Sequence, residues 1–72
     1  MPITPKAKQL AKSFRRMYNN GTSPVCWAQV QAGDGRHHWL SLSRDDIKTL
    51  HRDQDLQAVC QCMLINRGFI ER

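Results

Sequence analysis

Cysteine is scarce in this sequence. The three cysteines, Cys26, Cys60 and Cys62, are too few and odd in number for the disulfide framework that stabilises small secreted domains. No apolar run near the start is suited to a signal peptide, and no run anywhere is long enough to span a membrane. We therefore expect a cytoplasmic protein with reduced thiols and no membrane contact.

Motifs for metal binding and catalysis are also lacking. Cys60 and Cys62 are two positions apart on a predicted helix, about 200° around its axis, and cannot share one zinc ion there. The adjacent His37 and His38 would point to opposite faces of a strand. No serine, cysteine or carboxylate stands in a nucleophile motif, and no glycine-rich phosphate loop follows a strand. We expect no metal, no cofactor and no enzyme activity.

Acidic side chains are missing from the first part of the chain. Residues 1–22 contain five lysines and arginines and no aspartate or glutamate, whereas six basic and six acidic residues balance from residue 23 onward. The net charge of +5 therefore comes entirely from the first part. The 72 residues have room for a single domain, residues 1–72, with one core and no enclosed active-site cavity beside it.

The basic first part predicts an amphipathic helix over residues 5–19. Thr4 suits the N-cap, Pro5 suits the first helical position, and Gly21 is expected to end the helix. Apolar residues recur at helical spacing along one side: Ala7, Leu10, Ala11, Phe14, Met17 and Tyr18. The opposite side carries four cations, which we call the basic face: Lys8, Lys12, Arg15 and Arg16.

A β-hairpin is predicted over residues 25–42. Residue types alternate on both sides of Gly33-Asp34-Gly35, which suits a three-residue loop. This register pairs Cys26, Ala28, Val30 and Ala32 with Leu42, Leu40, His38 and Arg36 on one mostly apolar face. The other side, which we call the tryptophan face, carries Trp27, Gln29, Gln31, His37, Trp39 and Ser41. Either a helix covers it and the tryptophans are core, or it is a stacking or partner-binding surface formed by Trp27, His37 and Trp39.

Two more helices are expected, over residues 44–52 and 55–67. Ser43 and Asp55 are the expected N-caps, and Gly68 is the expected stop signal. An inward stripe is expected on the first of them at Ile47, Leu50 and His51. The last helix has two apolar stripes, Leu56, Val59, Cys60, Met63 and Leu64 on one side and Ala58, Cys62, Ile65 and Phe69 on the other. Only Gln57 and Gln61 form a polar strip between them, so a helix buried on most of its circumference is predicted. The expected fold is α+β, in the order α-β-β-α-α, with a two-stranded antiparallel hairpin packed by helices around a buried C-terminal helix.

The basic face is the main indication of function. Cations one turn apart along a helix suit a phosphate backbone, although a solvated helix that keeps a small protein soluble has the same pattern. The first hypothesis is a non-catalytic regulatory or accessory module that contacts DNA or RNA through the basic face. The second is a protein-binding inhibitor or adaptor, of the type carried by mobile elements, that docks on an acidic site of a larger partner.

Overall fold

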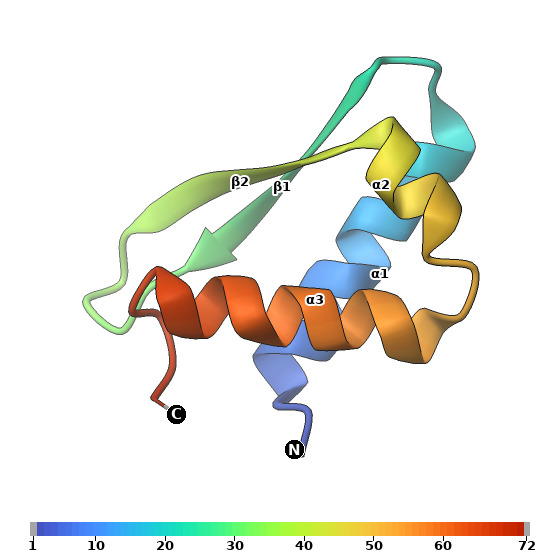
Figure 1. Ribbon diagram of the computed structural model, residues 1–72. Coiled ribbons are helices and arrows are strands. Elements are labelled where there is room, and N and C mark those ends of the chain that lie inside the picture. The colour runs from blue at the N-terminus through green and yellow to red at the C-terminus, as the bar shows by residue number, and fades with distance from the viewer. Residues whose placement is uncertain (1, 72) are drawn as a thin grey trace.

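The computed structural model describes residues 2–71 and confirms the α+β class and the element order (Figure 1). The elements are α1 (Pro5–Asn20), β1 (Val25–Gln31), β2 (His37–Ser43), α2 (Arg44–Thr49) and α3 (Asp53–Asn66). Figure 1 shows α3 crossing α1 below the hairpin, and α2 lying where β2 ends. Helix α1 packs against β1, α2 and α3, and therefore links all parts of the fold.

The hairpin has the register that its alternation predicts. Cys26 pairs with Leu42, Ala28 with Leu40 and Val30 with His38. The loop closes as expected: the Ala32 N–H donates to the Arg36 carbonyl (2.8 Å) and the Gly35 N–H donates to the Ala32 carbonyl (3.0 Å). Gly35 has a φ of 88°, the left-handed conformation that ends a three-residue hairpin loop. The loop therefore fixes which residues face the helices.

The core is built on the apolar side of α1. Ala7 and Phe14 are fully buried, and Leu10 and Ala11 nearly so. The inner face of the hairpin and the two other helices close over them with Cys26, Ala28, Val30, Leu40, Ile47, Leu56, Cys60 and Leu64. Phe14 is the largest fully buried side chain. The predicted apolar side of α1 is thus confirmed, except that Met17 is 40% exposed.

The start of α1 is joined to α3 through a buried glutamine. Thr4 caps α1 as predicted, because its Oγ1 accepts from the Ala7 N–H (3.2 Å). The Thr4 N–H and hydroxyl both donate to Oε1 of Gln61, at 3.1 and 2.9 Å. Gln61 is only 3% exposed, so this half of the polar strip on α3 is part of the interior. The polar side chain of Gln61 is accommodated in the interior because it bonds to a helix cap.

Helix α1 stops before Gly21 as expected, but Gly21 does not adopt the usual capping conformation. The helix ends at Asn20, and Gly21 is extended (φ −147°), so no left-handed glycine cap forms. The guanidinium of Arg44 takes this role instead: it donates to the carbonyls of Ser23 (2.5 Å), Tyr18 (2.7 Å) and Met17 (3.5 Å). A cation at the C-terminus of a helix also suits the helix dipole. The Arg44 guanidinium lies 4.8 Å from the centre of the Tyr18 ring.

The ends of the two later helices differ in part from the prediction. Ser43 caps α2 as expected, but α2 ends at Thr49 and His51 is exposed, so the predicted extension to residue 52 is wrong. Helix α3 begins at Asp53, two residues early, and Asp55 lies in its first turn instead of capping it. Gly68 (φ 79°) ends α3 as predicted, with the Phe69 N–H on the Leu64 carbonyl (2.8 Å).

Helix α3 buries one apolar stripe and not two. Leu56, Cys60 and Leu64 lie in the core, as predicted for the first stripe. Ala58 and Cys62 of the second stripe are exposed, and the prediction that α3 is buried on most of its circumference is wrong in this respect. Small apolar side chains cost little when they face water, so their spacing did not decide the question.

The buried thiol of Cys60 should make the protein less stable at alkaline pH. Burial raises its pKa from 9.0 to about 12. Because the folded state keeps the proton that the unfolded state loses, the free energy of unfolding should fall as the pH rises through 9, by about 1 kcal/mol between pH 8 and 10. Urea unfolding at several pH values measures this slope. The slope should flatten in Cys60→Ala and persist in Cys62→Ala; an unchanged slope in Cys60→Ala would contradict the assignment.

Candidate functional site

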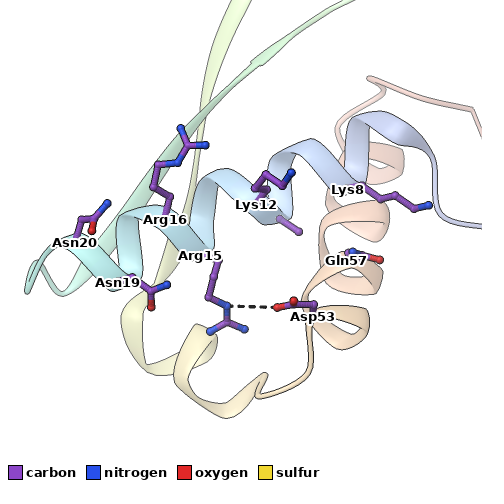
Figure 2. Close-up of a pocket in the computed structure, with 9 residues that line it drawn as sticks. Lys8, Lys12, Arg15, Arg16, Asn19, Asn20, Asp53 and Gln57 are labelled. Carbon is purple, nitrogen blue, oxygen red and sulfur yellow. Dashed lines mark ion pairs between the residues drawn. The ribbon is translucent and has the colours of Figure 1, made fainter.

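An open groove of about 520 Å³ lies between α1 and the start of α3, and we call it the basic groove. The whole basic face lines it, so the structure brings the four predicted cations together (Figure 2). The other lining residues are Ala11, Asn19, Asn20, Asp53 and Gln57. Asp53 is the one carboxylate among these lining residues.

Arg15 is held inside the fold. Its Nη2 donates to the Leu50 carbonyl (2.7 Å), which lies at the C-terminal end of α2. Its Nε lies 3.7 Å from Oδ1 of Asp53, and its side chain is only 25% exposed. Figure 2 shows Arg15 reaching down to Asp53 while Arg16 extends away from it. Arg15 therefore joins α1 to the segment between α2 and α3, and its cation lies beside the exposed carboxylate of Asp53.

The other three cations of the basic face are open. Lys8, Lys12 and Arg16 are exposed, and within residues 2–71 none has a hydrogen-bond or ion-pair partner. Successive positions four residues apart rise about 6 Å along a helix, so the three form a row along the groove. Among the residues that line the groove, this row of unpaired cations faces a single carboxylate, which has Arg15 beside it, so the groove can hold a chain of negative charges.

Uncharged amides extend the groove beyond the predicted residues. Asn19 follows Arg15 by four positions, so the same helical spacing that defined the basic face could have included it. Gln57 lies on α3 one turn after Asp53, and only the packing of α3 on α1 brings it into the groove. Amide side chains donate hydrogen bonds without adding negative charge, which suits phosphate oxygens or base edges.

The tryptophan face is open. Trp27 is 48% and Trp39 is 61% exposed, and His37 is exposed beside them. The inner side of the hairpin packs on α1, so this face is turned away from it. The alternative in which a helix covers the tryptophans is therefore wrong for the described part of the chain. The two faces are separate surfaces: the basic face lies on α1, and the tryptophan face lies on the side of the hairpin away from α1.

The histidines and cysteines are dispersed. Cys26 and Cys60 are buried and Cys62 is exposed, all three as free thiols. The rings of His38 and Phe69 meet edge to face at 5.2 Å. Within residues 2–71, no three histidine, cysteine or acidic side chains come close enough to hold a metal ion.

None of the helices formed by residues 2–71 has the length and apolar character needed to cross a bilayer. Comparison with protein-family models, with curated proteins and with solved structures found no match to this chain. The groove and the tryptophan face must therefore be interpreted from their own chemistry.

Proposed function

We propose that this chain is a small non-catalytic module that binds nucleic acid through the basic groove, in a regulatory or accessory role in the cytoplasm. The observation that carries the proposal is the row of Lys8, Lys12 and Arg16, which are exposed and without partners among the described residues. Each of these cations can neutralise one phosphate and release a counterion, and this release drives non-specific binding. The three free thiols support the cytoplasm as the compartment.

The balance of charge in the groove favours a polyanion over a single small anion. Lys8 and Arg16 are two turns apart, about 12 Å along the helix, which is more than one phosphate group spans. A nucleic acid strand offers one phosphate about every 3.4 Å along its axis and can engage the whole row. Arg15 contributes by holding Asp53, whose carboxylate would otherwise repel phosphates.

Charge-matched variants test the proposal. Lys8→Gln, Lys12→Gln and Arg16→Gln together remove three charges from the groove. The control, Lys48→Glu with Arg52→Gln, lowers the net charge by the same three units at exposed positions outside both the basic groove and the tryptophan face. In fluorescence anisotropy with a short labelled duplex and single strand at about 50 mM salt, the groove variant should bind about a hundredfold more weakly.

The control variant should bind nucleic acid nearly as the wild type does. If the groove variant and the control lose the same affinity, net charge alone is responsible and the basic groove is not the site. If the wild type binds no nucleic acid at low salt, the proposal is wrong and an acidic site on a protein partner becomes the better hypothesis for the same three cations.

A further inference from the structure

The tryptophan face contains large aromatic side chains that the fold does not use. Trp27 and Trp39 stay about half exposed on the side of the hairpin away from α1, although burial of either would have enlarged a small core. We propose that this face binds unpaired bases, so that a single-stranded nucleic acid binds more tightly than a duplex, which contacts the basic groove alone. This inference rests on the proposed function for its class of ligand, but on different residues.

The size of the face argues against a second protein as the occupant. Two strands of seven residues form a surface of about 23 by 10 Å. A stable protein interface takes in about 20–30 residues on each partner, whereas the tryptophan face has six. A second copy of the chain packed on the hairpin alone would therefore be held weakly. Bases need much less area, because each one stacks on a single ring.

The polar residues of the face match base edges. Gln29 and Gln31 each carry an amide that can donate and accept, and His37 and Ser41 add further hydrogen-bonding groups. None of the six residues of the tryptophan face is acidic. The centre of a protein-binding patch is usually apolar, whereas a mixture of aromatic rings and amides is typical of surfaces that read unpaired bases.

The charges around the face are complementary to a phosphate chain. Arg67 and Trp39 line the same hollow of about 450 Å³, beside the end of α3. On the other side of the hairpin, the Nζ of Lys6 donates to the carbonyl of Gln31 in β1 (2.6 Å). The nearest carboxylate along the chain, Asp34 in the loop, is paired with Arg36 at 3.6 Å. A single-stranded nucleic acid whose bases stack on the tryptophans can therefore place its phosphates near Lys6 and Arg67, at the two edges of the hairpin.

The register gives the spacing of the two tryptophan positions. Trp27 stands opposite Ser41, and Trp39 stands opposite Gln29, so the tryptophans are diagonal neighbours. Diagonal neighbours on one face of a sheet are about 7–8 Å apart. One base can stack on each ring at this distance, as two successive bases of an extended strand. A duplex cannot do this, because its bases are already stacked and paired.

The test separates bases from phosphates. Binding of a short oligothymidylate is compared with binding of an abasic strand of equal length, which has the same charge and no bases. The wild type should prefer the oligothymidylate by about 5- to 100-fold for each stacked base. Trp27→Thr with Trp39→Thr should abolish this preference, since threonine suits a strand but cannot stack. Trp27→Phe with Trp39→Phe should keep most of it, and circular dichroism checks that each variant folds.

Each outcome decides one of the two proposals. Equal binding of both strands by the wild type, or a preference that survives the threonine variant, overturns the inference and leaves the tryptophans as a small protein-docking patch. The groove variant (Lys8→Gln, Lys12→Gln, Arg16→Gln) should weaken both strands and leave the ratio between them unchanged. If it leaves abasic binding unaltered while the threonine variant removes the base preference, the proposed role of the groove fails and the inference about the tryptophan face stands.

Discussion

Phe14→Ala should remove a large part of the stability of the protein. Phe14 is fully buried on α1, the helix that packs against β1, α2 and α3. Removing a buried phenylalanine side chain costs about 3–5 kcal/mol, because apolar contacts are lost and a cavity remains. A chain of 72 residues is stable by roughly 4–10 kcal/mol, so the loss is a large part of the total. Urea unfolding followed by circular dichroism measures it.

Two variants serve as controls for Phe14. Met17→Ala lies one turn further along α1, where the side chain is 40% exposed, and should cost less than about 1 kcal/mol. Phe14→Leu keeps most of the apolar volume and should fall between the two. If Phe14→Ala unfolds at the same urea concentration as Met17→Ala, the core is not organised around α1.

Arg44→Ala should lower the free energy of unfolding by about 2–3 kcal/mol, since its charged hydrogen bonds to carbonyls at the end of α1 and just beyond it are lost. The side chain of Arg44 closes the end of α1 from the start of α2, with bonds to Ser23, Tyr18 and Met17. Arg44→Lys should recover less than half of this loss, because an ammonium cannot reproduce the planar fork. Thermal and urea unfolding of the two variants measure the difference.

The matched control for Arg44 is Arg52→Ala. Arg52 is exposed, and its nitrogen lies 4.0 Å from an oxygen of Asp55, a surface ion pair that should contribute less than about 0.5 kcal/mol. Equal destabilisation by the two substitutions would show that Arg44 acts only through its charge. A full recovery by Arg44→Lys would show that the fork geometry is unimportant.

Local sequence signals predicted the parts of the fold that local chemistry decides. Thr4 and Pro5 specify the start of α1, and alternation around Gly33-Asp34-Gly35 specifies the hairpin register. Gly68 specifies the end of α3, because few other residues adopt its positive φ. In each of these places the residues that determine the structure are close neighbours in sequence.

Long-range contacts decided what the sequence could not predict. Gln61 is buried because Thr4, 57 positions earlier, offers two donors to its side chain. Arg44 bonds to the last carbonyls of α1 in place of a left-handed glycine at Gly21, because β2 ends beside the C-terminus of α1. The choice between two apolar stripes on α3 likewise depends on which side meets α1, and periodicity alone does not contain that information.

In the candidate site, too, local spacing predicted which residues lie together, and long-range contacts decided the rest. Helical spacing placed the four cations of the basic face together, and the groove contains all of them. Helical spacing could not show that Arg15 bonds to the Leu50 carbonyl and pairs with Asp53, because those partners lie far along the chain. Alternation placed Trp27 and Trp39 on one face, but only the position of the helices shows that this face is open.

The salt dependence of duplex binding tests the central claim most directly. With Lys8, Lys12 and Arg16 each on one phosphate, the logarithm of the binding constant should fall with the logarithm of salt concentration with a slope of about −2.7. Gln at all three positions should bring the slope close to zero, while the charge-matched control keeps the wild-type value. A slope that is the same in the groove variant and the wild type would contradict the account.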